Sequence, residues 1–126
     1  MHMSHLKVVR SFLIAQAAIF VAAVSIHFGW LVTGYQHQAA GTAESVIACV
    51  LLAGLLLTWA PPPWARRAAI AAQAFGVLGV LVGLYTIAAG FGPRTALDLT
   101  LHGGMLIALL AGLVVTARAP REVPAG

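Results

Sequence analysis

Two residues that can do chemistry lie one helical turn apart in an apolar stretch near the C-terminus. The stretch runs from Thr95 to Thr116 and carries a carboxyl group at Asp98 and an imidazole at His102. A spacing of four residues places both side chains on one face of a helix. Because ionisable groups are costly in lipid, this pair predicts polar partners in the interior of a membrane protein.

Two further ionisable residues in apolar stretches are the candidate partners. Gln16, Phe20, Ala23 and His27 follow one another at steps of four, three and four residues, which predicts a single inward-facing helix side ending at His27. Glu44 lies near the start of the next apolar stretch. We therefore expect an imidazole and a carboxyl group to meet the pair on the last helix.

The two histidines are expected at a similar depth. His27 lies about six residues before the outer end of its helix and His102 about six after the outer start of its own, so each is roughly 9 Å in. They can then face each other. The remaining candidates for an outward-facing polar pocket belong to the same half of the molecule: Glu44, Asp98, Tyr85 and Thr86.

One hypothesis is a metal site built from His27, His102, Asp98 and Glu44. Imidazole and carboxylate ligands together suit a transition metal such as zinc, iron or manganese. Asp98 can alternatively orient the His102 ring without touching the metal. The pattern is less specific than an HExxH helix, because these ligands come one or two from each helix.

The same cluster leaves two other chemical alternatives open. A haem bound between His27 and His102 is one, since histidines are common axial ligands of haem iron. A small proton- or ion-coupled transporter is the other, since chains of carboxylates and histidines carry protons in such proteins. The sequence shows no discontinuous helix or inverted repeat of the kind that many transporters contain.

Each polar residue also has a purely structural interpretation. Thr95 and Asp98 form a capping-box pattern, and Glu44 suits the positive end of a helix dipole if it lies in a first turn. The histidines can hydrogen-bond a neighbouring helix, and Gln16 and Gln73 are expected to tie helices together. On this interpretation the protein is a non-catalytic membrane subunit whose polar groups only join helices.

The elements that must position these residues are membrane-spanning helices. Hydrophobic residues make up 61% of the 126 positions and charged residues only 8%, whereas a soluble domain carries roughly 25% charged residues. A spanning helix needs about 20 apolar residues. We predict an all-α membrane protein, an antiparallel four-transmembrane-helix bundle in lipid, with one domain and spans at about 11–33, 43–59, 68–89 and 95–116.

The ends of two spans carry further signals. Trp59 to Arg67 reads WAPPPWARR, and three prolines with two tryptophans predict a turn at the membrane surface. The first span, with Lys7 and Arg10 before it, also suits a cleavable signal peptide. Its apolar run is longer than a usual signal core, so we expect a retained helix.

Basic residues predict the orientation. Those expected at the end of the bundle that holds both termini are Lys7, Arg10, Arg66, Arg67, Arg118 and Arg121, which leaves Arg94 at the other end. The positive-inside rule then places both termini in the cytoplasm. This bias accounts for the net charge of +4, and the dispersed basic residues give no indication of nucleic-acid binding.

Several motifs of soluble enzymes are missing from the sequence. It contains no Gly-rich phosphate loop, serine nucleophile elbow or paired-carboxylate hydrolase pattern, which argues against an enzyme that works alone. Cys49 has no second cysteine to pair with and is expected to be a small buried apolar residue.

Small residues at helical spacing suggest close helix packing. Gly79 and Gly83 form one such pair, and Gly104, Ala108 and Ala111 form a second face. Together they offer more close-packing surface than one small bundle uses. We therefore predict a homo-oligomer or a subunit of a larger membrane complex.

Two long stretches carry a resemblance. AESVIACVLLAGLLLTW (Ala43 to Trp59) and AAQAFGVLGVLVGLYTIAAGFGPRTALDL (Ala71 to Leu99) resemble a group of uncharacterised small four-span bacterial integral membrane proteins. The resemblance covers most of the chain. It implies a multi-pass protein of the bacterial cytoplasmic (inner) membrane and brings no activity, cofactor or partner with it.

Overall fold

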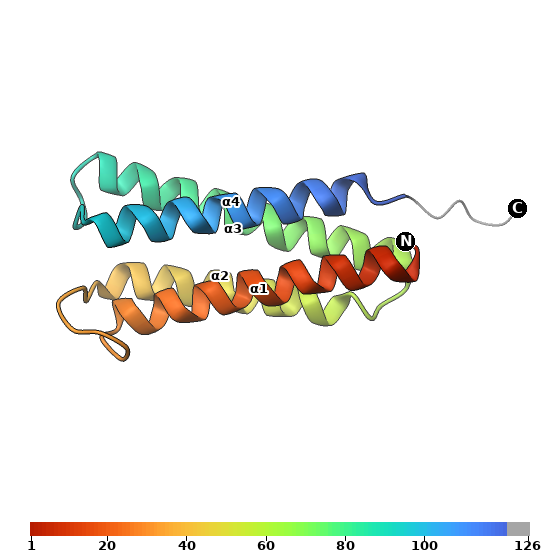
Figure 1. The fold of residues 1–126 in the computed structure, drawn as a ribbon, viewed down its shortest axis with the longest axis horizontal. Coiled ribbons are helices and arrows are strands. Elements are labelled where there is room, and N and C mark those ends of the chain that lie inside the picture. Colours follow the sequence, from red (N-terminus) through yellow and green to blue (C-terminus); the bar gives the residue numbers. More distant parts are fainter. Residues whose placement is uncertain (121–126) are drawn as a thin grey trace, which may run out of the picture.

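The computed structural model describes residues 1–120 as four long α-helices. They are α1 (Met3–His27), α2 (Gln38–Leu57), α3 (Pro62–Ala88) and α4 (Ala96–Arg118). Each is long and apolar enough to cross a membrane, so the chain is a multi-pass integral membrane protein and the predicted all-α four-helix fold is confirmed. Successive helices run in opposite directions, and the N-terminus lies at the same end of the bundle as the end of α4 (Figure 1).

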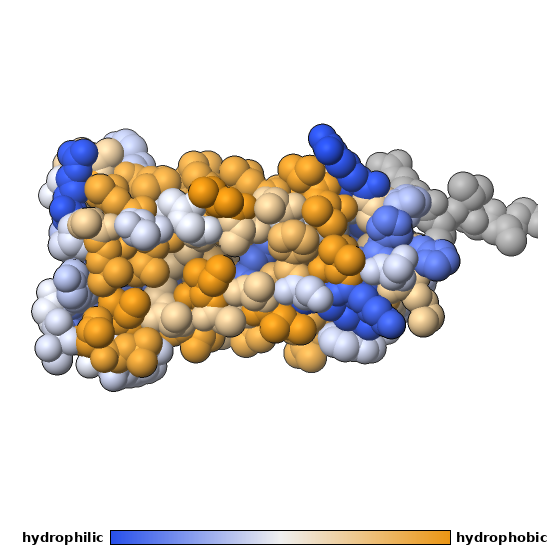
Figure 2. Space-filling model, viewed as in Figure 1, coloured by the Kyte–Doolittle hydropathy of each residue, from blue (hydrophilic) through white to orange (hydrophobic). Residues whose placement is uncertain are grey.

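The helices pack as a ring around a narrow core. α1 and α3 each pack against both α2 and α4. The largest side chains fully buried between them are Phe20, Leu13, Leu51, Met105 and Leu109. Apolar residues cover most of the middle of the visible face, and hydrophilic residues lie at both ends (Figure 2). The apolar side chains on the outside of the bundle contact lipid. Polar side chains within the membrane-spanning segments are therefore placed in the interior, where they can hydrogen-bond to neighbouring helices.

The first two helices differ from the predicted spans at the end of the bundle opposite the N-terminus. α1 stops at His27, not at Thr33, and α2 begins at Gln38, not at Ala43. The chain between them is held by the His37 amide, which donates to the His27 carbonyl at 2.9 Å. The His37 ring also accepts the Ala40 amide at 3.1 Å and so caps α2. His27 is therefore the last residue of its helix rather than six residues inside it.

The proline turn is shorter than predicted. α2 ends at Leu57 and α3 already begins at Pro62, so Pro62 and Pro63 occupy the first helical turn. Proline is well suited there because the amide groups of a first turn have no partner within the helix. α2 ends before the prolines, with Thr58 as its C-cap, and all three prolines belong to the start of α3, where Pro61 is the N-cap.

Two arginines stabilise the C-terminal ends of α2 and α4, at the end of the bundle where the chain begins. Arg10 donates to the Thr58 hydroxyl at 2.9 Å and to its carbonyl at 3.0 Å, and its guanidinium lies 4.0 Å from the centre of the Trp59 ring. Arg66 donates to the Ala117 carbonyl at 2.6 Å. Positive groups are favourable at helix C-termini, so these contacts fix the ends of α2 and α4.

A buried amide cluster ties three helices together, as predicted for Gln16 and Gln73. Gln16 Nε2 donates to Gln73 Oε1 at 3.0 Å and to the Ala108 carbonyl at 2.9 Å. Gln73 Nε2 donates to Thr116 Oγ1 at 2.9 Å. Gly112 makes room for the cluster, because a Cβ there would collide with both amide groups. The cluster joins α1, α3 and α4 in the half of the bundle near the N-terminus.

Two predictions about small residues are wrong. Gly79 and Gly83 do not offer spare packing surface, because they face Ile47 and the His102 ring inside the bundle. Cys49 is exposed on the outside of α2 rather than buried. At Gly104 a Cβ would meet no atom within 4 Å among the described residues, so the predicted packing of this face against a neighbouring helix stays a prediction.

Candidate functional site

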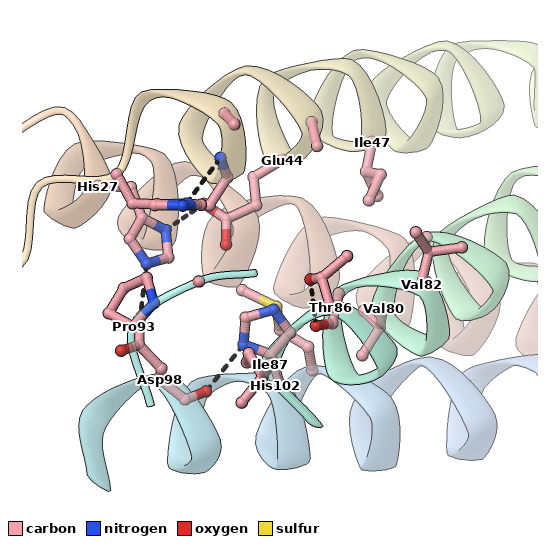
Figure 3. Close-up of a pocket in the computed structure, with 18 of the residues that line it drawn as sticks. His27, Glu44, Ile47, Val80, Val82, Thr86, Ile87, Pro93, Asp98 and His102 are labelled. Atoms are coloured by element: carbon pink, nitrogen blue, oxygen red, sulfur yellow. Dashed lines mark hydrogen bonds and ion pairs between the residues drawn. The ribbon is translucent and has the colours of Figure 1, made fainter. Parts of the chain in front are cut away.

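A cavity of about 330 Å³ lies at the end of the bundle opposite the N-terminus. Four predicted site residues line it, one from α1, one from α2 and two from α4: His27, Glu44, Asp98 and His102 (Figure 3). The rest of the wall is largely apolar, with Phe20, Ile47, Val80, Ile87 and Met105. The residues that sequence spacing grouped together are thus brought to one cavity.

His27 bridges the two carboxyl groups. Its Nδ1 lies 2.7 Å from Glu44 Oε2 and its Nε2 lies 3.1 Å from Asp98 Oδ1, and the side chain is buried. If both carboxyl groups are ionised, both ring nitrogens carry a proton and donate one hydrogen bond each. The imidazolium then neutralises one of two negative charges, and the cluster keeps a net charge of about −1.

Asp98 serves the helix and the site together. Its amide donates to Thr95 Oγ1 at 3.1 Å, and its Oδ2 accepts the Thr95 amide and hydroxyl, which confirms the predicted capping box. The second carboxylate oxygen, Oδ1, is left for His27. The cap therefore fixes the direction in which Asp98 meets the cavity.

Glu44 does not lie at a helix start, so the interpretation of its carboxylate as a partner of the helix dipole is wrong. α2 begins at Gln38 and its first turn contains no acidic residue. Glu44 is only 5% exposed, its Oε2 meets His27, and its Oε1 has no partner among the described residues. A buried oxygen without a hydrogen bond is costly, which marks Oε1 as a place for a ligand atom.

His102 presents a nitrogen to the same space. Its Nδ1 lies 2.8 Å from the Asp98 carbonyl, which only accepts hydrogen bonds, so Nδ1 carries the proton. Nε2 then holds a lone pair and makes no hydrogen bond within residues 1–120. Gly83 gives it room, because a Cβ there would lie 2.7 Å from Nε2.

The two pocket residues predicted on α3 behave differently. Thr86 lines the cavity, although its hydroxyl donates to the Gly83 carbonyl at 2.7 Å. Tyr85 is 68% exposed and does not line the cavity, so its assignment to the pocket is wrong. A neighbouring position on a helix points about 100° away, and α3 turns Tyr85 outward.

Sequence reasoning missed His37 as a site residue. It lines the cavity, and its ring lies edge-on to His27 with centroids 6.3 Å apart. The polar turn between the first two spans contained it, but no periodicity extends through a turn. Phe91, Gly92 and Pro93 from the turn before α4 also line the cavity and were missed for the same reason.

The metal and haem hypotheses can be compared with these contacts. Among residues 1–120, no three His, Cys, Asp or Glu side chains are arranged to hold a metal ion. Both nitrogens of His27 are engaged by carboxylates, so in this arrangement it binds neither a metal nor a haem iron. Glu44 Oε1 and His102 Nε2 remain as two potential donor atoms without a hydrogen bond among the described residues, on side chains that line the cavity.

Fold and site together define a small multi-pass membrane protein with a carboxylate–imidazole cluster at one end of an apolar cavity. Compared with known protein families, curated proteins and solved structures, the chain matches none of them.

Proposed function

We propose that the protein is a non-catalytic ligand-binding protein of the bacterial inner membrane, whose cavity faces outward. The observation that carries this proposal is the buried, unpartnered Glu44 Oε1 on the wall of a cavity of about 330 Å³. Ligand sites are typically apolar hollows with a few placed polar groups, which describes this cavity. The acid–base groups beside it are held by one another, which supports binding rather than chemistry.

The distribution of basic residues supports an outward-facing cavity. Lys7, Arg10, Arg66, Arg67 and Arg118 lie on the segments at the N-terminal end of the bundle, and Arg94 lies in the turn at the cavity end. Arg121 lies outside the described residues. By the positive-inside rule, both termini belong in the cytoplasm and the cavity on the opposite side.

Packing below the cavity favours binding over transport. Phe20, Met105 and Leu109 are at most 1% exposed and fill the core between the cavity and the Gln16–Gln73 cluster. A proton-coupled transporter needs polar groups that connect the two sides. The apolar layer interrupts such a connection, because it closes the inner end of the cavity.

The protein also offers a surface for assembly. Gly104 and Ala111 are exposed on α4, with Ala108 half-buried between them. Small residues at this spacing let two helices approach closely in a membrane. We propose that α4 packs against a second copy or against another subunit, and that the protein acts as an oligomer or as an accessory subunit.

A metal ion is a second candidate for the ligand, favoured by His102. Its Nδ1 donates to a backbone carbonyl, the support that metal-bound histidines usually have, and its Nε2 is free. Glu44 Oε1 supplies a second donor atom. A transition metal held by these two atoms needs water or ligand atoms for its other positions.

The test is to identify what the cavity holds. Protein is purified in lipid nanodiscs without chelator or histidine tag, and is examined by mass spectrometry of its organic extract, elemental analysis and absorption spectroscopy. We expect one occupant per chain in the wild type and a strong reduction in Glu44→Gln, with Ser45→Ala on the same helix as the control. A wild-type protein without any organic or metal occupant would contradict the proposal.

A further inference from the structure

The free atoms in the cavity identify the chemical class of the ligand. Building on the proposed ligand-binding function, we propose that the ligand is a primary ammonium ion that carries an apolar tail. The ammonium group hydrogen-bonds to Glu44 Oε1 and His102 Nε2, and the tail lies against the apolar wall between α2 and α3.

Both free atoms accept hydrogen bonds. The proton of His102 is fixed on Nδ1 by the Asp98 carbonyl, so Nε2 offers only a lone pair. Glu44 Oε1 belongs to a carboxylate whose other oxygen already accepts from His27. A ligand that satisfies both must donate at least two hydrogen bonds, and a primary ammonium group has three donors.

The charge of the cluster selects a cation. With Glu44 and Asp98 ionised and His27 protonated on both ring nitrogens, the cluster carries one net negative charge. The described residues that line the cavity include no lysine or arginine. A buried charge is costly unless it is paired, so a singly charged cation completes the cluster.

The shape of the cavity accommodates a tail. Ile47, Val80, Ile87 and Met105 form an apolar wall beside the polar groups. The lining also includes Ala43 of α2 and Val82 of α3, both of which are exposed on the outer surface of the bundle. Ala39, Phe91 and Pro93 at the end of the bundle are exposed lining residues as well, so the proposal places the tail at the part of the opening between α2 and α3, on the side that lipid covers.

A positive charge, several N–H donors and an apolar tail together distinguish the proposed ligand from an alcohol, a quaternary ammonium ion and an inorganic cation. An alcohol with the same tail lacks the charge and donates one hydrogen bond. A quaternary ammonium ion has the charge but no N–H group, and such ions are typically bound in aromatic cages. An inorganic cation has no tail for the apolar wall.

The binding experiment uses hexylammonium as the probe. Its affinity for the wild type in phosphatidylcholine nanodiscs is measured by calorimetry, with empty nanodiscs as the blank, beside 1-hexanol and tetraethylammonium. We expect hexylammonium to bind at least about tenfold more tightly than either, since one charge-assisted hydrogen bond is worth about 1.4 kcal/mol or more. Glu44→Gln and His102→Phe should each weaken hexylammonium binding at least about tenfold, and Ser45→Ala should leave it unchanged.

A second pair of variants tests the side opening. Ala43→Trp places a large ring at the opening between α2 and α3 and should abolish hexylammonium binding. Val46→Trp adds the same ring to α2 at a position that is 51% exposed and does not line the cavity. It should leave binding intact. Equal binding by both variants would contradict the proposed place of the tail.

The outcomes separate this inference from the proposed function. If hexanol binds as tightly as hexylammonium, the ammonium assignment is wrong and the ligand-binding function stands. If zinc binds and is lost in Glu44→Gln and His102→Phe while hexylammonium does not bind, the cavity is a metal site and the ammonium assignment is again wrong. If no probe binds and no occupant copurifies, both proposals are wrong.

Discussion

His27 has two tasks in this molecule. It joins α1 to α2 and α4 through Glu44 and Asp98, and it keeps two buried carboxylates from facing each other without a cation. Its position at the very end of α1 brings the ring to the cavity wall, and the His37 amide holds the carbonyl behind it. Two buried carboxyl groups therefore depend on the placement of one imidazole ring.

Replacing His27 with alanine should be strongly destabilising. Breaking a buried ion pair by removing one partner costs about 3 to 5 kcal/mol, because the remaining charge is left uncompensated. The free energy of unfolding can be measured by reversible denaturation in bicelles. His5→Ala, at an exposed position near the N-terminus, is the control and should change it by less than about 0.5 kcal/mol. Equal losses in the two variants would show that the bridge is not formed.

Gly83 controls the position of the His102 ring. A Cβ at Gly83 would lie 2.7 Å from Nε2, so Gly83→Ala should push the ring away and weaken hexylammonium binding about tenfold. Gly103→Ala is the matched control on α4, because its Cβ would meet no described atom within 4 Å. Replacing glycine with alanine stabilises a helix by up to about 1 kcal/mol in both variants. A difference in binding between the two variants therefore cannot be due to a change in helix stability. Unchanged affinity in Gly83→Ala would argue against a ligand contact at Nε2.

At the scale of the helices, faces were easier to predict than ends. Gln16, Phe20, Ala23 and His27 are all buried, as their spacing predicted, because a helix repeats its faces regularly. Helix ends depend on single capping contacts that have no periodicity. The His37 cap starts α2 earlier than expected and moves Glu44 out of the first turn, which changed its role from a dipole partner to a partner of His27.

The Gln16–Gln73 cluster offers a test of how polar groups hold the helices together. Gln73→Leu removes one of the two partners of Gln16 Nε2 and one of the two partners of Thr116 Oγ1, and should cost about 1 to 2 kcal/mol in the free energy of unfolding. The double variant Gln16→Leu/Gln73→Leu should recover part of this loss, because no buried amide is then left without its partner. Gln38→Leu, at the exposed start of α2, is the control. A double variant that is no more stable than Gln73→Leu alone would contradict this account.

At the scale of the whole molecule, polar groups occupy two levels with an apolar layer between them. The histidine–carboxylate cluster lies at one level and the glutamine cluster at the other, separated by Phe20, Met105 and Leu109. Most of the site could be predicted, because a chain with so few ionisable residues has few ways to use them inside a membrane. The lining residues contributed by the turns, His37 among them, could not, because their positions depend on how turns and neighbouring helices pack.

Orientation decides which compartment the cavity serves, and cysteine labelling can test it. Cys49, the single cysteine, is first replaced by alanine, and a cysteine is then introduced by Thr33→Cys in the exposed turn at the cavity end or by His5→Cys near the N-terminus. The basic residues on the N-terminal end should keep that end in the cytoplasm. We therefore expect a membrane-impermeant maleimide to label Thr33→Cys in intact cells and His5→Cys only after the membrane is opened. The reverse pattern would place the cavity in the cytoplasm, where its ligand would have to come from inside the cell.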